Sequence, residues 1–249
     1  MSYYNTRLLT YPTGQQVSFY SKNIASGNDA ELSDNFRKSY SNAERTEKLE
    51  QHCSAVSLKH TKNNIYQIAR ANTWDWFVTL TFARNDFDAS DYDKVVDRLC
   101  SFLRHSIYRK CPGIKYLIVP ELHSDRLNYH FHGLLANAGG LRFSYSGHND
   151  RNGNPVFNIL DWKAGFTTAT RITDTIRASS YITKYITKEN VQLLKNKKRY
   201  YTNHKVDRPE EDYLIFDEDA FLDVYASDIE YCKSVTVKEA GMRINYYEI

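Results

Sequence analysis

The chain has 249 residues, and its 33 Lys and Arg against 30 Asp and Glu give a net charge of +3. Its 41% of hydrophobic residues, with only 10 Gly and 5 Pro, excludes collagen-like, fibrous and wholly disordered proteins. Apolar runs such as residues 116–119 are far shorter than the ~20 residues of a membrane span, so we expect no membrane partner.

The cysteines and the first residues indicate where the protein works. Four cysteines, at positions 53, 100, 111 and 232, form no Cys-x-x-Cys pair. This scatter is typical of reduced thiols rather than of a disulfide framework or a zinc ribbon. The first residues form no apolar signal segment. We therefore expect a cytoplasmic protein.

The N-terminal part of the chain is polar. Residues 1–55 show clusters such as Ala25-Ser26-Gly27-Asn28-Asp29 and no sustained period, which predicts an arm or a peripheral layer. Residues 43–71 lack Gly and Pro and predict a helix, with Leu58, Ile65 and Ile68 on one stripe.

The pattern then changes to strands with two further helices. Period-two alternation, strongest at Trp76–Phe82, predicts five strands, over residues 76–82, 115–123, 129–136, 156–162 and 166–172. A helical period predicts helices over Asp91–Lys110 and from Ser179 to about Leu194. Short connections between these strands favour an α+β fold, a central antiparallel sheet with helices packed on it. We expect this domain to span residues 56–205, and residues 206–249 to be an acidic extension packed on the core.

Charge is distributed unevenly towards the C-terminus. From Lys184 to Arg208 eight Lys or Arg face only two acids, whereas residues 209–230 contain nine acids and no Lys or Arg. A basic block within the first segment combines phosphate-binding charges with aromatic rings that can stack on bases. Its candidate DNA-binding residues are Lys195, Lys197, Lys198, Arg199 and Tyr200. A solvated surface loop is the alternative.

A candidate metal site lies in the third predicted strand. His130 and His132 are two residues apart, so both imidazoles project from one face and can share a cation, while Phe131 points into the core. On the preceding strand Glu121 and His123 also share a face, and either can lie beside the histidine pair. Two imidazoles and a carboxylate with open positions are typical of a catalytic site that binds a phosphate oxygen.

A candidate nucleophile lies in the last predicted helix. Residues 181–188 contain one tetrad twice, with Tyr181 and Tyr185 on one face and Lys184 and Lys188 on another. A tyrosyl oxygen can form covalent intermediates, and a nearby lysine can stabilise a phenolate or position a phosphodiester. An amphipathic helix whose tyrosines only border the core is the alternative.

Three segments of the chain resemble, in their order, the three motifs of HUH endonucleases. They are Phe77-Val78-Thr79-Leu80-Thr81-Phe82, His130-Phe131-His132-Gly133 and Tyr181-x-x-Lys184-Tyr185-x-x-Lys188. The chain is similar in particular to two-tyrosine rolling-circle replication initiation (Rep) proteins of small single-stranded-DNA phages and related bacterial elements. The resemblance covers about residues 72–205. It implies an RRM-like HUH fold and strand-specific cleavage of single-stranded DNA, with a 5′-phosphotyrosine link and a free 3′-hydroxyl.

The resemblance also implies roles for individual residues. It makes His130 and His132 metal ligands, with Glu121 as the third ligand and His123 as the second choice. Mn or Mg suits this donor set and a phosphate. Tyr181 and Tyr185 become the paired nucleophiles, and Lys184 and Lys188 the lysines of the third motif.

The partners follow from what the sequence lacks. No GxxxxGK[ST] phosphate loop occurs, so we expect a separate helicase and a DNA polymerase as partners at the replication origin, in the cytoplasm of a bacterial host. Two other classes remain open at this point. One is a transposase or relaxase that uses the same HUH chemistry, and the other is a non-catalytic single-stranded nucleic-acid-binding module.

Overall fold

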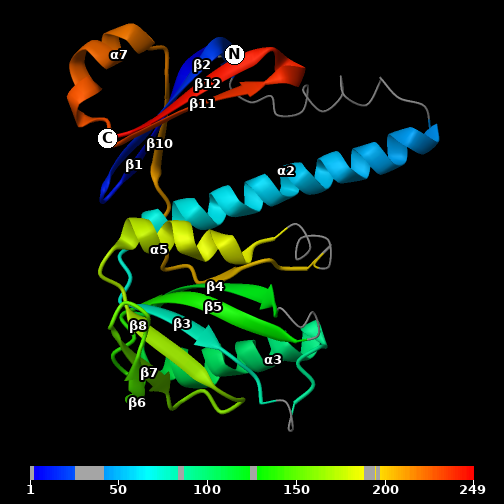
Figure 1. Ribbon diagram of the computed structural model, residues 1–249, viewed down its shortest axis with the longest axis vertical. Helices are drawn as coiled ribbons and strands as arrows, with labels where there is room; N and C mark the ends of the chain where they lie inside the picture. Colours follow the sequence, from blue (N-terminus) through cyan, green and yellow to red (C-terminus); the bar gives the residue numbers. More distant parts are fainter. Residues whose placement is uncertain (1–2, 26–41, 84–86, 124–127, 188–193, 195–196) are drawn as a thin grey trace. The chain divides into compact units, whose positions relative to one another are not determined.

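The computed structural model describes residues 3–25, 42–83, 87–123, 128–187, 194 and 197–249 (Figure 1). The chain divides into two units, one of Met1–Leu49 with Pro209–Ile249 and one of Glu50–Arg208. Each unit contains an antiparallel sheet, so the predicted α+β class, with helices packed on antiparallel sheets, is confirmed.

The Glu50–Arg208 unit contains a seven-stranded sheet in the order β6-β7-β8-β3-β5-β4-β9. Its strands are β3 (Trp76–Leu80), β4 (Lys115–Leu122), β5 (Tyr129–Ala136), β6 (Phe143–Asn149), β7 (Pro155–Ile159), β8 (Thr167–Arg171) and β9 (Tyr201–Thr202). Every pairing in this order is antiparallel. Strand β3 therefore lies between β8 and β5, and β5 lies between β3 and β4.

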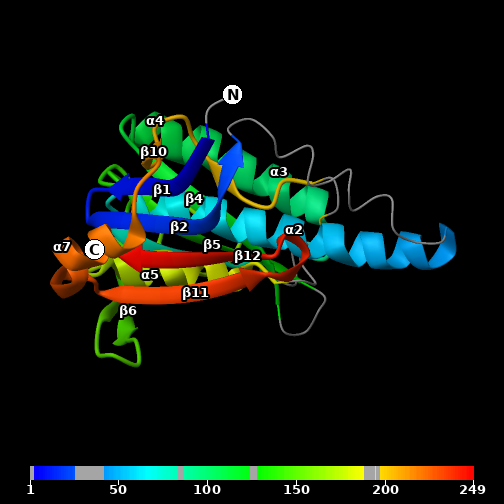
Figure 2. The same cartoon turned by 90° about the horizontal axis from the view of Figure 1, so that it is seen from above.

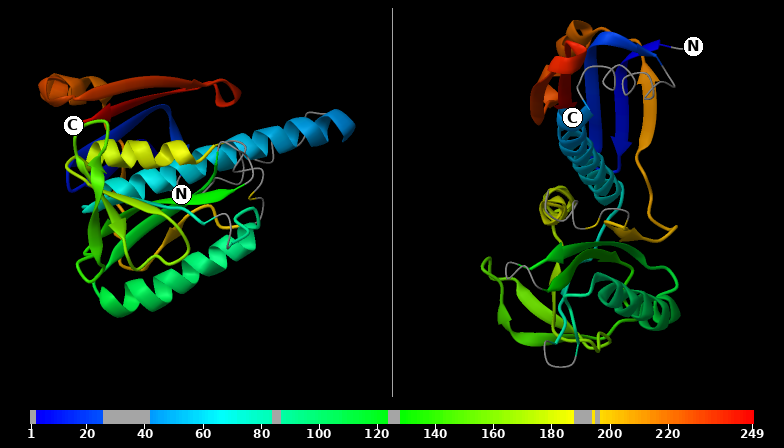
Figure 3. Two further views of the ribbon diagram at one scale, coloured as in Figure 1. Left: turned by 60° about the horizontal axis from the view of Figure 1, so that its bottom comes forward. Right: turned by 90° about the vertical axis from the view of Figure 1, so that its right-hand side faces the viewer.

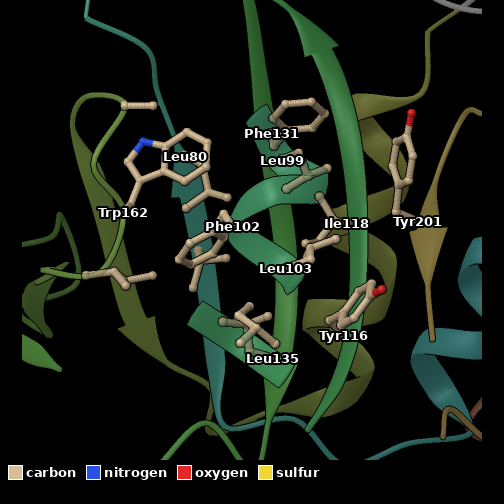
Figure 4. Close-up of a cluster of buried hydrophobic side chains, with 14 of the residues drawn as sticks. Leu80, Leu99, Phe102, Leu103, Tyr116, Ile118, Phe131, Leu135, Trp162 and Tyr201 are labelled. Carbon is tan, nitrogen blue, oxygen red and sulfur yellow. The ribbon is translucent and has the colours of Figure 1, made fainter. Parts of the chain in front are cut away.

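One face of this sheet packs against α3 (Tyr92–Phe102). Strand side chains that alternate with period two, among them Val78, Ile118 and Phe131, are at most 1% exposed on this face. Leu99 and Phe102 of α3 pack into the same cluster, and Trp162 completes it (Figure 4). Asp91 caps α3 by accepting hydrogen bonds from the backbone N–H groups of Asp93 and Lys94.

The opposite face packs against α2 (Asn42–Arg70) and α5 (Thr175–Ile182). Figure 3 shows α3 on one side of the sheet and these two helices on the other. Ile65 and Ile68 of α2 and Ile182 of α5 are fully buried against Leu117 and Leu134. Leu58 packs on the same cluster, which confirms the predicted α2 stripe.

Two predicted helices differ from the sequence expectation, one in its regularity and one in its bounds. The helix expected over Asp91–Lys110 is divided into α3, a π-helical turn (Leu103–Ile107) and α4 (Tyr108–Lys110). The helix expected from Ser179 begins at Thr175, because Asp174 caps it by accepting from the Arg177 N–H. The expectation that it continues to Leu194 is wrong.

The early end of α5 has a local cause. A 3₁₀ turn (Thr183–Tyr185) follows α5, and Ile186 is extended, with φ −90° and ψ 99°. Two β-branched pairs, Ile182-Thr183 and Ile186-Thr187, lower helix propensity here. The Thr183 hydroxyl also donates to the Ser180 carbonyl at 2.7 Å, which competes with the backbone hydrogen bonds of the helix.

The other unit contains a five-stranded sheet in the order β10-β1-β2-β12-β11, which Figure 2 shows from above. Its strands are β1 (Tyr3–Tyr11), β2 (Gly14–Ala25), β10 (Glu210–Leu214), β11 (Tyr231–Val237) and β12 (Met242–Glu248). Phe221 of α7 (Glu218–Tyr225) packs on Val17 and Phe19 of β2.

The sequence analysis predicts an arm or a peripheral layer over residues 1–55 and does not predict this second sheet. Residues 3–25 form two strands, and the acidic segment supplies β10 and α7. Polar residues within the strands, such as Gln15, Gln16 and Ser18, hide the period-two pattern. The sequence analysis does not predict β6 either, because its alternation is limited to Phe143 and Tyr145 and the residues from Gly147 to Asn149 add no apolar position.

None of the helices in the described parts of the chain is both long and apolar enough to cross a membrane.

Two glycines allow close approaches of the backbone. A Cβ at Gly133 of β5 would lie 3.0 Å from Ile118 Cγ1, 3.2 Å from the Leu117 carbonyl oxygen and 3.3 Å from Val78 Cγ2. A Cβ at Gly140, in the turn after β5, would lie 2.0 Å from the Lys110 carbonyl oxygen. Any larger residue at Gly140 must therefore displace the backbone at the end of α4.

The neighbouring glycines 139 and 140 give a matched test of this packing. We expect Gly140→Ala to lower the free energy of unfolding by about 2 to 3 kcal/mol, because backbone atoms cannot move aside as a flexible side chain can. Gly139→Ala should change it by less than about 1 kcal/mol, since nothing lies within 4 Å of its added methyl group. Urea unfolding followed by circular dichroism measures both values. Equal destabilisation by the two variants would contradict the close approach at Gly140.

Candidate catalytic centre

Strand β5 supplies two histidines to the centre, because its side chains alternate between the two faces of the sheet. His130 and His132 lie on the face that packs against α2 and α5, the face of Leu134 and Ala136. Phe131 points to the α3 face and is fully buried there. The predicted arrangement of two histidines on one face, with Phe131 in the core, is confirmed; His132 is buried and His130 is half-buried.

Strand β4 brings a carboxylate to this face. The antiparallel register places Glu121 opposite His130 and Val119 opposite His132. The Glu121 side chain crosses to the diagonal neighbour, and its Oε2 lies 2.6 Å from His132 Nε2. The predicted proximity of Glu121 to the histidine pair is therefore confirmed.

Strand β3 contributes a contact that the motifs did not identify. Thr79 lies directly opposite His132, and its Oγ1 is 3.1 Å from His132 Nδ1. Both ring nitrogens of His132 are thus engaged, one by a hydroxyl and one by a carboxylate. Because a carboxylate only accepts, Nε2 carries the proton in this contact, and in a neutral ring Thr79 donates to Nδ1. The β3 alternation, which puts Thr79 on the histidine face, is the signal that could have identified it.

The two tyrosines lie over this histidine. The ring of Tyr185 stacks on the ring of His132, with centroids 3.6 Å apart and an interplanar angle of 13°. The ring of Tyr181 is 5.5 Å from that of Tyr185 and nearly perpendicular to it. Phe77 of β3 supports both rings, at 5.3 Å from Tyr181 and 6.2 Å from Tyr185. Tyr181 and Tyr185 therefore meet as predicted, although Tyr185 belongs to the 3₁₀ turn.

The tyrosines differ in their environment. Burial raises the pKa of the Tyr185 hydroxyl well above its ordinary value, and a hydrogen bond with Tyr181 and the charge of Glu121 act in the same direction. Tyr185 is half-buried, whereas 43% of Tyr181 is exposed. Tyr181 is thus the more exposed of the two tyrosines.

The lysines of the same segment are less fully described. Lys184 is exposed, and its Nζ lies 5.0 Å from the centroid of the Tyr181 ring, a cation–π distance. Lys188 lies outside the described residues. Of these two lysines, Lys184 is therefore the one that the structure places next to the tyrosine pair.

His123 and His130 face each other at the edge of the centre. The ring of His123 stacks on that of His130 with a centroid distance of 4.6 Å. His123 thus contacts one of the two predicted ligands, whereas Glu121 contacts the other. Both candidates for a third ligand remain near the pair.

The donor set fits a divalent metal ion in its chemistry. In the parts of the chain that the structure describes, no group of three or more His, Cys, Asp and Glu side chains lies close enough together to hold a metal ion. Two donors, His132 Nε2 and Glu121 Oε2, nevertheless converge, and His130 lies opposite Glu121. A cation would replace the proton between them, and Nδ1–H would then donate to Thr79, as metal-bound histidines commonly do.

The basic block follows the edge of the sheet beside β9. Lys197 Nζ contacts both carboxylate oxygens of Asp93 on α3 at 2.8 Å. Arg199 donates to Ser57 and Thr61 of α2. Lys198 is exposed, Tyr200 packs partly against the α2 and α5 face, and Lys195 lies outside the described residues. Lys197 and Arg199 therefore have partners within the protein, whereas Lys198 is exposed and its side chain has no partner among the described residues.

Comparison with protein families agrees with part of the resemblance. Residues 75–190 match a family model described as replication-associated protein, of the ORF2 type. The match runs from β3 to the segment after α5 and includes Glu121, His130, His132, Tyr181 and Tyr185. The chain is thus similar to replication-associated proteins over the part that carries the candidate centre.

A comparison with curated proteins gave no significant match, and neither did a comparison with solved structures.

The Thr79 contact predicts an effect on metal affinity. We expect Thr79→Val to raise the Kd for Mn²⁺ by about tenfold, because loss of a hydrogen bond that orients a ligating histidine commonly weakens metal binding ~10- to 100-fold. Thr168→Val is the matched control, since Thr168 lies opposite Thr79 on β8 and is exposed. Isothermal titration calorimetry measures the Kd. An unchanged Kd in Thr79→Val would show that Thr79 does not orient a metal ligand.

Proposed function

We propose that this protein is a site- and strand-specific single-stranded-DNA endonuclease that initiates rolling-circle replication. The observation that carries the proposal is the stack of Tyr185 on His132, with Glu121 and Tyr181 in contact with that pair. A nucleophile and a phosphate-activating group lie on one face of one sheet. The similarity of residues 75–190 to replication-associated proteins supports a role in replication.

The proposed reaction conserves the number of phosphodiester bonds. The hydroxyl oxygen of Tyr181 or Tyr185 attacks the scissile phosphorus, a tyrosyl O–P bond forms and the P–O3′ bond breaks. The tyrosine proton leaves and the departing O3′ gains a proton. The products are a 5′-phosphotyrosine link and a free 3′-hydroxyl that can prime synthesis. A second 3′-hydroxyl can later attack the link and release the tyrosine.

The residues around the tyrosines have defined roles in this proposal. Tyr181 is accessible to a strand, whereas Tyr185 is held by the His132 ring. Lys184 lies close enough to the Tyr181 ring to stabilise negative charge that develops on its oxygen. Phe77 holds both rings in place from the sheet.

The residues that would hold a divalent cation are His130, His132 and Glu121, with His123 as the alternative third ligand. Such a cation, Mn or Mg, would neutralise charge on the non-bridging oxygens of the scissile phosphate. Thr79 would orient His132 for this purpose.

The proposal includes partners. The sequence contains no phosphate loop of the GxxxxGK[ST] type, so we propose that a separate helicase opens the duplex and that a polymerase extends the 3′-hydroxyl. We propose the cytoplasm of a bacterial host as the location.

Two other functions use the same features. A transposase or relaxase would carry out the same chemistry on other DNA ends. A non-catalytic binding module would bind single strands on the sheet and the basic block without cleaving them. The tyrosine–histidine stack favours cleavage over binding alone, because binding alone does not require a nucleophile next to a metal-binding histidine.

The covalent link gives the most direct test. Single-stranded oligonucleotides that tile the cognate replicon should form an adduct with the protein in the presence of Mn²⁺, visible on a denaturing gel. We expect the double variant Tyr181→Phe Tyr185→Phe to form none, while each single variant retains part of the yield. The reason is that each hydroxyl can act as the nucleophile.

Tyr145→Phe is the control for this experiment, because Tyr145 is an exposed tyrosine of β6 outside the centre. The Tyr145→Phe variant should form the adduct in unchanged yield. A chelator should abolish adduct formation. An adduct formed by the double variant would refute the proposed nucleophiles. Tight binding with no adduct from any oligonucleotide would favour the binding module.

Lys198 tests the basic block without disturbing the fold. Since Lys197 and Arg199 have partners on α3 and α2, their substitution would affect stability as well as binding. We expect Lys198→Gln to weaken single-strand binding and to reduce the slope of log K against log salt by about 0.7, the value for one phosphate contact on a single strand. Arg109→Gln, at another exposed cation, is the control. Fluorescence anisotropy at several salt concentrations measures the slope, and an unchanged slope would place Lys198 off the DNA path.

A further inference from the structure

A cavity lies beyond the end of β3, in the region where Trp162 packs on α3 residues. Its volume is about 360 Å³, in the lower part of the ~300 to 1,000 Å³ range of small-molecule sites. The described residues that line it come from three segments: Ala83 and Phe87 after β3, Arg98 on α3, and residues 162–166 between β7 and β8. None of them belongs to the candidate catalytic centre.

The wall formed by residues 162–166 is held firmly. Trp162 Nε1–H donates to the Thr81 carbonyl at 2.9 Å, and the Ala83 N–H donates to the Ala164 carbonyl at 2.9 Å. The Thr81 N–H donates to the Phe166 carbonyl at 2.9 Å. A Cβ at Gly165 would lie 2.4 Å from the Thr81 carbonyl oxygen. This wall is thus packed directly on the backbone after β3. A ligand that binds there would therefore lose little free energy to ordering the residues of the wall.

The side chains of the cavity combine aromatic rings with positive charge. Phe166 is 76% exposed, although a phenylalanine is usually buried. Phe87 is partly buried and Trp162 is buried, so Phe166 is the exposed ring of the three. Arg98 and Lys163 are exposed, and within the described residues neither forms an ion pair. Arg98 lies 5.8 Å from the centroid of the Phe87 ring. The described lining contains no acidic residue.

This combination matches one class of ligand. An anion alone would use Arg98 and Lys163 but would leave the Phe166 ring in water. An apolar ligand would use the rings but would leave the two cations unpaired. A nucleotide has both a planar base that stacks on an aromatic ring and a phosphate that pairs with cations.

The position of the cavity relates it to the candidate centre. In the β3–β5 register Leu80 lies opposite Phe131, so His130 lies one residue further towards the end where β3 stops. Glu121 lies opposite His130 at the same end. Residues 81–83 continue β3 from this end into the wall of the cavity. The two sites lie on opposite faces of the sheet, since Arg98 and Trp162 belong to the α3 side and His130 to the side of α2 and α5. A strand that leaves the centre at this end must therefore pass around the end of β3 to reach the cavity.

We propose that this cavity binds one nucleotide, with its base stacked on Phe166 and its phosphate between Arg98 and Lys163. The nucleotide can be a residue of a bound single strand or a free mononucleotide. The first source rests on the proposed function, in which single-stranded DNA is the substrate.

Binding without cleavage tests the proposal. Isothermal titration calorimetry with chelator present measures the Kd of the oligonucleotide dT10 and of dTMP for the full chain. We expect Phe166→Ala to raise the Kd of the ligand that uses the cavity by about tenfold, the effect of losing one stacked base. The double variant Arg98→Gln Lys163→Gln should raise it as well. Because Phe166 is largely exposed, its substitution should leave the melting temperature nearly unchanged.

Tyr145→Ala and Arg151→Gln are the matched controls, as an exposed ring and an exposed cation outside the cavity. An effect of Phe166→Ala on dT10 alone identifies the strand as the source, and an effect on dTMP identifies the free nucleotide. Unchanged Kd values for both ligands would overturn the proposal. So would binding of inorganic phosphate that depends on Arg98 and Lys163 while neither nucleotide responds to Phe166→Ala. An absent covalent adduct with Phe166-dependent binding would refute the proposed cleavage and leave the nucleotide site standing.

Discussion

The register of β5 between β3 and β4 is the constraint on which the candidate centre depends. Side chains alternate across a strand, so a shift of one residue would turn His130 and His132 towards α3 and Phe131 towards the tyrosines. Burial of Phe131 against α3 opposes that shift, because the shift would remove the Phe131 ring from the core and place two imidazoles among apolar side chains. The hydrophobic core on one face thus fixes the position of the polar groups on the other.

Much of the larger unit can be predicted because its signals are local. The apolar alternation of β3, β4 and β5 and the helical period of α2 and α3 are sufficient for the elements and their antiparallel arrangement. The five-stranded sheet is not predicted because polar residues hide the alternation of its strands and because two of its four pairings, β1 with β10 and β2 with β12, join the two ends of the chain. Such non-local pairing leaves no pattern within one segment. The end of α5 is not predicted either, because a pattern of period four does not show where β-branched residues stop a helix.

The candidate centre is predictable in its chemistry and less so in its contacts. Histidines, a carboxylate and tyrosines are recognisable by type and spacing, but the side chain that each one touches depends on packing between elements. Thr79 is an example, since a threonine in a strand has no chemical signature until the register places it against His132. Lys197 and Arg199 are the converse case. Their positive charge indicates a nucleic-acid surface, whereas Asp93 on α3 and Ser57 on α2 bind them within the protein.

The close approach at Gly133 changes how the motif His130-Phe131-His132-Gly133 is to be interpreted. Two of its four positions carry the candidate chemistry, while Phe131 fills the core and Gly133 lets Ile118 and Val78 approach the backbone. The motif is therefore partly a signature of packing. A homologous chain that keeps the aromatic residue and the glycine but replaces both histidines should still fold into this sheet. Sequence searches that weight all four positions equally would then group homologues that lack the candidate chemistry with homologues that have it.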